Sequence, residues 1–319
     1  MPQSPTLNDV RKARELIRPY THHTPVLTSA SLNQKMGGEI YFKCENFQKT
    51  GSFKIRGACN ALLSLSEGER NRGVTTHSSG NHAQALACAA RTMDIQATIV
   101  MPENAPSVKI NAVSGYGADI RFCQPTQHAR EAMCAEVQKE TGAVFIPPFN
   151  DNRIIAGQGT AALELLTDYP GLDTILTPVG GGGLLSGSAI TARGLAQGTQ
   201  VIGTEPEAAN DAWLSFNKGE LIPVNQPNTI ADGLRTSLGD LTFAVISAYV
   251  TDIVTVKEDQ IIQAMKFIWE RMKIIIEPSS AVPVAALLSN KIDVRGKKTG
   301  IIMSGGNVDL DRLPWADSR

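Results

Sequence analysis

Short β-branched runs alternate with helical patterns along most of this 319-residue chain. Residues 74–77 are typical of a strand and a helical pattern follows Asn81, and the same succession recurs over 97–101 and after Ser107. Further strands are expected at 39–43, 119–122, 143–146, 174–179, 200–205 and 299–303, and further helices at 55–65, 127–140, 155–167 and 184–196. Because such alternation with short connections is typical of βαβ units, the sequence predicts an α/β fold with parallel sheet covered by helices.

The composition and the charge balance narrow the class of protein. Apolar residues make up 42% of the chain and charged residues 19%, which predicts a large core and excludes wholesale disorder. Thirty Lys and Arg residues oppose 31 Asp and Glu residues, and this balance argues against nucleic acid or an anionic membrane as a partner. The length suits about two domains of roughly 150 residues each. Pro147-Pro148 interrupts the pattern and marks the expected crossing between them.

Neither export nor a membrane anchor is predicted. The N-terminal segment lacks an apolar core followed by a small-residue cleavage site, and no apolar run approaches the roughly 18 residues of a membrane span. The five cysteines are scattered and form no CxxC pair. That pattern is typical of reduced thiols rather than of a disulfide framework or a zinc site. We therefore expect a cytoplasmic protein.

Four consecutive glycines, Gly180–Gly183, follow an expected strand and precede an expected helix. Backbone N–H groups without side chains at a helix N-terminus can close around a phosphate group. The run does not match G-x-G-x-x-G, since Leu185 and Ser186 stand where the third glycine is required, and it lacks the GK[ST] ending of a P-loop. The pattern therefore indicates a site for a single phosphate monoester, and a merely flexible turn is the alternative.

Two other turns and one lysine are candidates for chemistry. The segment 78–82 (SSGNH) begins a helix, where hydroxyl and N–H groups either hold a carboxylate or simply cap the helix. The segment 304–307 (SGGN) places a hydroxyl after the last expected strand. Lys54 begins a helix and would by itself be a solvated surface charge. Beside a phosphate site, however, a lysine amine is what a phosphate-bearing aldehyde such as pyridoxal phosphate requires.

Six motifs occur in one order: TGSFKIRGA at 50–58, SSGNHAQA at 78–85, AGQGT at 156–160, VGGGGLLSG at 179–187, ADG at 231–233 and SGGNVD at 304–309. Together they resemble the serine/threonine dehydratase and serine racemase group of fold-type II pyridoxal phosphate (PLP) enzymes, over essentially the whole chain. The resemblance implies a tryptophan synthase β-like α/β fold with two open, twisted, mostly parallel sheets flanked by helices. It also implies a large PLP-binding domain, 1–65 with 151–319, and a small mobile domain, 66–150.

The resemblance assigns the cofactor site residue by residue. Lys54 matches the lysine that binds the cofactor covalently, and Phe53 lies beside it in the same motif. Asn81 matches the residue that bonds the ring hydroxyl of the cofactor. Gly180–Gly183 and Leu184 match the cup that holds its phosphate.

The expected chemistry is proton exchange or elimination at the α-carbon of an amino acid. Ser304 matches the hydroxyl that faces the pyridine nitrogen, and a neutral group there disfavours transamination because it stabilises a protonated ring poorly. Threonine dehydratases of the group typically read SAGNH, whereas in serine racemases and hydroxyaspartate dehydratases a second serine, Ser79 here, faces the α-carbon opposite the lysine. Racemisation needs two such groups, so Lys54 and Ser79 are the expected catalytic residues. The α-carboxylate is expected to bind to Ser78, Ser79, Gly80, Asn81 and His82.

The segment 205–211 (EPEAAND) matches in spacing the divalent-cation site of serine racemases. The resemblance implies ligands from the carboxylates of Glu205 and Asp211 and from the carbonyl of Ala209. Oxygen ligands of this kind suit Mg²⁺ or Ca²⁺. Without the resemblance, the segment reads more simply as a solvated acidic loop.

Two further implications concern regulation and substrate choice. Eukaryotic serine racemases bind ATP between subunits, and the matching positions here are Ser29, Lys49, Thr50, Tyr116, Asn150, Lys273 and Asn307. Arg130 matches an arginine that approaches the active site when the small domain closes. A guanidinium there would grip a second substrate carboxylate and favour 3-hydroxyaspartate over serine. A solvated helix residue is the alternative for Arg130.

We therefore expect a PLP-dependent serine racemase that also acts as an ammonia-lyase on small β-hydroxy amino acids, and the resemblance implies a homodimer. An L-threo-3-hydroxyaspartate ammonia-lyase and a plain L-serine/L-threonine dehydratase stay open as alternatives. A ligand-sensing protein that kept the fold and lost the chemistry is a further alternative. The intact Lys54, Asn81 and Ser304 argue against it.

Overall fold

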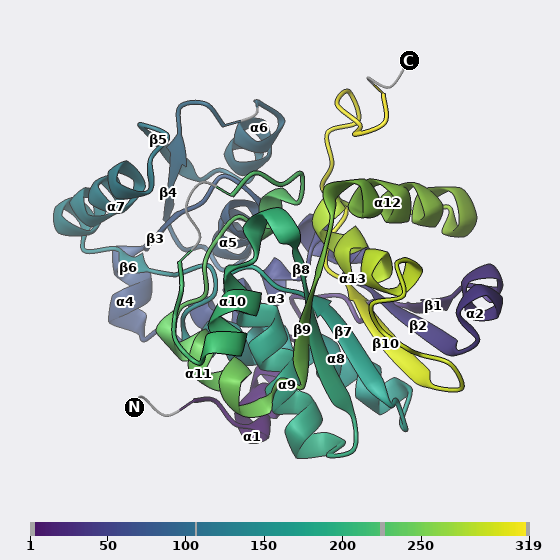
Figure 1. Ribbon diagram of the computed structural model, residues 1–319. Helices are drawn as coiled ribbons and strands as arrows, with labels where there is room; N and C mark the ends of the chain where they lie inside the picture. The colour runs from purple at the N-terminus through teal and green to yellow at the C-terminus, as the bar shows by residue number, and fades with distance from the viewer. Residues whose placement is uncertain (1–3, 106, 224–226, 317–319) are drawn as a thin grey trace.

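Two sheets organise the chain (Figure 1), whose structure, a computed structural model, describes residues 4–105, 107–223 and 227–316. The larger sheet has the strand order β1 (Val26–Thr28), β2 (Glu39–Cys44), β10 (Lys298–Met303), β7 (Thr174–Pro178), β8 (Gln200–Pro206) and β9 (Asp252–Val256). The smaller sheet has the order β5 (Asp119–Cys123), β4 (Ala97–Pro102), β3 (Val74–His77) and β6 (Val144–Phe145). Among these strands β1 alone pairs antiparallel, so the predicted α/β fold with two mostly parallel sheets is confirmed.

Helices cover both faces of the larger sheet. Successive residues of a strand point to opposite faces, so each central strand supplies two cores. Ile301 of β10 packs with α12 (Glu258–Met272) and α13 (Pro278–Leu288), whereas Ile302 packs with α8 (Asn152–Asp168) and α9 (Gly183–Leu195). We call this sheet with its helices the large lobe.

The smaller sheet forms the small lobe with α5 (Asn81–Thr92), α6 (Ser107–Gly115) and α7 (Gln127–Thr141). Helix α3 (Lys54–Leu63) lies between the lobes. Ile55 and Leu62 of α3 share a core with Leu86 of α5, while a Cβ on Gly157 of α8 would lie 2.6 Å from the Cα of Gly57. The domain boundaries at 65 and 151 and the mobility of the small domain stay predictions.

The remaining elements lie mostly outside the alternating pattern: α1 (Leu7–Ile17), α2 (Ala30–Met36), η1 (Glu45–Phe47), η2 (Lys49–Gly51), α4 (Glu67–Arg72), η3 (Glu207–Ala209), α10 (Asp211–Lys218), η4 (Asp232–Leu234) and α11 (Asp240–Tyr249). Two expected bounds shift for local reasons. The helix expected at 155 begins at Asn152 because the Asp151 carboxylate accepts hydrogen bonds from the N–H groups of Arg153 and Ile154. The strand expected at 143–146 shrinks to two residues, since the prolines that follow have no N–H for a ladder.

Two further sequence expectations concern the cysteine thiols and the hydropathy of the helices. All five cysteines are free thiols, as their scatter predicted. In the described parts of the chain, no helix combines the length and the hydropathy that a bilayer crossing requires.

Candidate active site

The residues expected to carry the chemistry follow the carboxyl ends of parallel strands. β3 ends at His77 and leads into the segment 78–82, β10 ends at Met303 and leads into 304–307, and β7 ends at Pro178 just before the glycine run. Parallel strands bring their carboxyl ends to one edge of a sheet, where ligands of open α/β folds bind. Because β7 and β10 are parallel neighbours in the larger sheet, the glycine run and the segment 304–307 lie at one edge. The segment 78–82 comes from the smaller sheet and joins them through hydrogen bonds of Asn81 to Glu277 and Asn307.

Lys54 is held at the first turn of α3. Its Nζ donates a hydrogen bond to the carbonyl oxygen of Pro148 at 2.7 Å and lies 5.2 Å from the ring centroid of Phe53. The Phe53 N–H donates to the carbonyl oxygen of Ser304 at 3.0 Å, which joins this turn to the end of β10. Burial lowers the pKa of Lys54 to about 8, against the opposing effect of the Glu277 charge. A substantial fraction of the amine is therefore neutral near physiological pH and can act as a base or nucleophile.

The glycine run Gly180–Gly183 has no room for side chains. A Cβ on Gly181 would lie 2.2 Å from the ring of Phe149, and Gly182 adopts a φ of +86°. Gly182 caps α9 without a side-chain hydrogen bond, so the first-turn N–H groups from Gly183 and Leu184 onward are not needed within the helix. The run therefore presents bare N–H groups at a helix N-terminus, as a phosphate requires.

Asn81 is oriented by two residues of the large lobe. Its Nδ2 donates to both carboxylate oxygens of Glu277, at 2.9 and 3.1 Å, and its Oδ1 accepts from Nδ2 of Asn307 at 2.9 Å. Glu277 is buried, and burial raises its pKa to about 8. The sequence reasoning missed Glu277, because a glutamate before Pro278 at a helix start carries no signal beyond ordinary capping.

Ser304 is buried directly after β10. Its Oγ lies 3.0 Å from Oγ of Ser280, which also accepts a hydrogen bond from the N–H of Gly305 at 2.6 Å. The Ser280 hydroxyl donates in turn to the Gly305 carbonyl. The Ser304 hydroxyl is therefore fixed by a hydroxyl of α13, on the same edge as Lys54.

The loop 78–82 leaves polar groups uncommitted. Ser78 Oγ accepts a 3.4 Å hydrogen bond from Gly80 N–H, but Ser79 has no side-chain partner within the described residues. Gly80 begins α5 without a side-chain cap. His82 is buried and its Nε2 donates to the carbonyl oxygen of Ile146 at 3.0 Å. Burial, with a smaller contribution from Lys54, lowers the pKa of His82 to about 3, so the ring is neutral.

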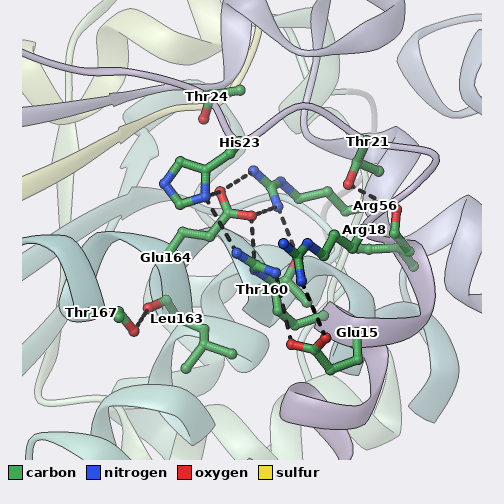
Figure 2. Close-up of polar contacts among 12 residues, drawn as sticks. Glu15, Arg18, Thr21, His23, Thr24, Arg56, Thr160, Leu163, Glu164 and Thr167 are labelled. Atoms are coloured by element: carbon green, nitrogen blue, oxygen red, sulfur yellow. Dashed lines mark hydrogen bonds and ion pairs between the residues drawn. The ribbon is translucent and has the colours of Figure 1, made fainter.

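A buried ion cluster anchors α3 to the large lobe. The Arg56 guanidinium contacts both oxygens of Glu45 at 2.7 and 2.8 Å and both oxygens of Glu164 at 3.0 and 2.8 Å. Lys43 and Glu164 are 2.7 Å apart. Figure 2 shows the Glu164 carboxylate between Arg56 and the ring of His23. The turn that carries Lys54 is thus tied to α8 and η1.

The expected cation ligands lie together at the end of β8. Glu205 and Asp211 are both buried, and Glu205 accepts hydrogen bonds from the N–H groups of Ala212 and Trp213. Burial raises the pKa of Asp211 to about 6, and burial with the neighbouring Asp211 raises the pKa of Glu205 well above its usual value. Asp211 Oδ1 is buried without a partner among the described residues. Together with the buried Ala209, this donor set fits a hard divalent cation.

Of the residues expected to bind ATP, Asn307 and Thr50 are hydrogen-bonded to each other. Asn307 donates to the carbonyl oxygen of Thr50 at 2.7 Å. Asn150 is committed elsewhere, because its Nδ2 donates to Asp240 at 2.7 Å and its Oδ1 accepts from Leu241 N–H. The others are placed separately by the fold: Ser29 caps α2, Lys49 lies in η2, Tyr116 follows α6 and Lys273 ends α12.

Arg130 lies in the first turn of α7. Its Nε is buried and without a hydrogen-bond partner in the described parts of the chain. Burial lowers the pKa of His77, and the charge of Arg130 contributes, which places the guanidinium near the end of β3. The residue as a whole is partly exposed, so its role in binding substrate stays a prediction.

The comparison with protein families decides the class. The model of the pyridoxal-phosphate dependent enzyme family matches residues 17–305. The chain belongs to this family. This PLP-dependent enzyme is 51% identical to serine racemase of Dictyostelium discoideum, over 97% of this chain and 96% of that protein, and the crystal structure of that racemase superposes with a TM-score of 0.91. It is 48% identical to β-hydroxyaspartate dehydratase of Paracoccus denitrificans (98% and 99% covered), and the structure of maize serine racemase matches with a TM-score of 0.95 at 44% identity (97% and 95% covered).

The site fits PLP. The glycine run is a cradle that any Cβ would fill, Lys54 supplies an amine, and the Ser304 hydroxyl lies on the same edge. A phosphate, an aldehyde and a ring nitrogen are the groups that such a set would hold. The comparisons confirm the predicted family, fold class and enzyme class.

Proposed function

We propose that this PLP-dependent enzyme racemises serine and also eliminates water from small β-hydroxy amino acids, acting as an ammonia-lyase. One observation carries the proposal. Asn81 of the loop 78–82 donates to both oxygens of Glu277, whose charge acts on Lys54, while the Ser79 hydroxyl of the same loop has no partner among the described residues. The names of the relatives, serine racemase and β-hydroxyaspartate dehydratase, support the same pair of activities.

In this proposal the chain supplies two groups that exchange protons at the α-carbon. PLP, when bound, supplies an electron sink for the pair left when the Cα–H bond breaks. The free amine of Lys54 takes the proton of the L-isomer, and the Ser79 hydroxyl delivers a proton to the opposite face to give the D-isomer. The substrate α-carboxylate docks on the N–H and hydroxyl groups of the loop 78–82 at the start of α5.

Elimination competes with reprotonation. When the β-hydroxyl leaves with a proton as water, the released product hydrolyses to a keto acid and ammonia. Closure of the small lobe would exclude solvent and bring Ser79 to the α-carbon. A barrier difference of about 1.4 kcal/mol changes the partition between the two outcomes tenfold.

Replacing Ser79 tests the assignment of two bases. The S79A enzyme, supplied with PLP and Mg²⁺, should lose D-serine formation while it keeps measurable pyruvate formation from L-serine. S78A is the matched control in the same loop, and it should weaken both activities together through the substrate carboxylate. Equal racemisation by S79A and the wild type would refute the role of Ser79, and pyruvate without D-serine from the wild type would make the chain a plain dehydratase.

A second candidate, an L-threo-3-hydroxyaspartate ammonia-lyase, is favoured by the buried and unpartnered Nε of Arg130. A bidentate guanidinium would hold the second carboxylate of that substrate. R130M should then lose keto acid formation from hydroxyaspartate by more than tenfold and keep turnover of L-serine. R121M is the control, because Arg121 is exposed and 3.5 Å from Glu140. Equal losses on both substrates would remove the second candidate.

The proposal includes the setting of the enzyme. A Mg²⁺ or Ca²⁺ ion held by Glu205, Asp211 and the Ala209 carbonyl would satisfy the unpartnered Asp211 oxygen. The substrate is a free amino acid, the assembly a cytoplasmic homodimer, and ATP an effector bound near Thr50 and Asn307. Sedimentation with and without ATP tests the last two points together.

A further inference from the structure

The chain crosses from the small lobe to the large lobe through residues 146–149, which we call the crossing segment. Ile146 extends the pairing of β6, since its N–H donates to the carbonyl oxygen of Thr75 at 2.9 Å. Two residues beyond the segment, Asp151 caps α8 of the large lobe. The segment is therefore fixed to a strand at one end and to a helix at the other.

Three residues of the crossing segment each contact a different part of the active site. The Ile146 carbonyl accepts a hydrogen bond from His82, next to Asn81, at 3.0 Å. The Pro148 carbonyl accepts a hydrogen bond from Lys54 Nζ at 2.7 Å. The Phe149 ring covers the glycine run, where a Cβ on Gly181 would lie 2.2 Å from it. The connection between the lobes is thus part of the wall of the site.

The two prolines restrict the backbone that leads to the Pro148 carbonyl. Pro147 and Pro148 each hold φ near −65° and donate no N–H. A residue before proline is restricted to extended backbone, which constrains Ile146 and Pro147 as well. Beyond the prolines, the Asp151 N–H donates to the carbonyl oxygen of Phe149 at 3.0 Å and the Phe149 ring packs against the glycine run, so the peptide that carries the Pro148 oxygen is held on both sides.

We propose that the crossing segment positions Lys54, and that the Pro148 carbonyl holds the free amine and stabilises the ammonium that it becomes. The inference rests on the proposed role of Lys54 as base. When the Cα–H bond breaks, the electron pair stays with the carbon, the proton forms a new N–H bond on Nζ, and the nitrogen becomes positive. The charged or titratable groups around it are Glu277, which favours the ammonium, and His82, which is neutral. The carbonyl supplies the directional contact.

An ester in the main chain tests the contact with every side chain in place. Phenyllactic acid at position 149 keeps the Phe149 ring and turns the Pro148 carbonyl into an ester carbonyl, a weaker acceptor. The N–H lost from residue 149 makes no hydrogen bond within the described structure. The control is the same ester at Phe267 in α12, which costs one helical hydrogen bond away from the site.

The first readout is the pKa of Lys54 in the cofactor-free full chain, from competitive acetylation followed by peptide mass spectrometry. The ester at 149 should lower it by about one unit, because the ammonium loses its acceptor, and the ester at 267 should leave it unchanged. In the PLP-loaded enzyme, kcat for pyruvate formation should fall about tenfold at constant pH while KM for L-serine stays within twofold. These changes are not expected from a general loss of stability.

The outcomes separate this inference from the proposed function. An unchanged pKa of Lys54 in the folded ester variant overturns the positioning role, whatever the enzyme's activity. A lowered pKa in a protein whose wild type turns over no amino acid supports the contact and refutes the proposed function. If the ester variant does not fold, P148A against P170A gives the same readout, because Pro170 is an exposed proline at the far end of α8. A Lys54 pKa that is equal in those two variants overturns the inference.

Discussion

Replacing Arg56 with methionine should destabilise the helix turn that carries Lys54, because Arg56 ties α3 to Glu45 and Glu164. Methionine fills a similar volume but leaves two buried carboxylates without their shared partner. Glu164 keeps Lys43 at 2.7 Å and Arg14 at 3.3 Å. Glu45 keeps only the hydroxyl of Thr24, at 2.6 Å, among its described side-chain partners. The cost of R56M therefore falls mainly on Glu45.

The magnitude follows from the burial of these groups. Breaking a buried ion pair from one side costs about 3–5 kcal/mol, because the remaining charge stays desolvated. A protein of ordinary stability unfolds at a cost of about 5–15 kcal/mol, so R56M should remove a large share of it. The double variant R56M/E45Q should recover about 1–3 kcal/mol, since a neutral amide does not need the lost cation.

Urea denaturation followed by tryptophan fluorescence measures these differences. The control is R295M, because Arg295 and Asp293 form an exposed pair that contributes little to the free energy of unfolding. The pH dependence gives a second check. In the wild type, Arg56 and Lys43 overcome burial and lower the pKa of Glu164 to about 2, so that contribution is lost as the pH falls below about 4.5. R56M within about 1 kcal/mol of the wild type, or a double variant less stable than R56M, would refute this reasoning.

Three further predictions concern the site. A chelator that removes the proposed divalent cation should lower the Tm at about pH 7.5 and not at about pH 4.5. The pKa of Asp211 is raised to about 6, so its carboxylate is charged, and needs the cation, only at the higher pH. D211N should abolish the effect of the chelator. Pyruvate formation from L-serine should rise with pH and level off above about 8, as Lys54 loses its proton, and a flat profile would contradict its role as base. K109M should raise KM for L-serine two- to fivefold, about 0.5–1 kcal/mol, because Lys109 of α6 pairs with Asp232 of η4 across the lobes. K266M should leave KM unchanged, because Lys266 is an exposed residue of α12.

The alternation of strands and helices was enough to predict the architecture and the place of the site. Eight of the ten strands in the described residues begin within a residue of the sequence expectation, because buried parallel strands are short apolar runs with clear ends. The segments 180–183 and 304–307 meet because the strands before them are parallel neighbours, whereas the segment 78–82 follows a strand of the other sheet and reaches them only through the packing of the two lobes. The lowered pKa of Lys54, in contrast, depends on its three-dimensional surroundings.

Contacts between distant helices were beyond sequence reasoning. The motif AGQGT had no role in the sequence reasoning beyond the family resemblance. Gly157 is required because α8 crosses α3 at Gly57, and Gly159 because α9 crosses α8 at Gly187. Glu277 orients Asn81 from almost two hundred residues away, and no local pattern announces it. Such residues are defined by what packs against them rather than by their neighbours in the chain.

The two faces of α3 bear on the predicted closure of the small lobe, which would leave Lys54 in place. On the α8 side the contacts are directional, since Arg56 forms four short hydrogen bonds to two carboxylates and the backbones of Gly57 and Gly157 touch. On the α5 side the contacts are small and apolar, with Ala58 facing a helix rich in alanine. Apolar contacts are non-directional and permit sliding, whereas a buried ion pair does not. Closure would therefore move the loop 78–82 toward a base that stays in place, which is the geometry that proton exchange on two faces of one carbon requires.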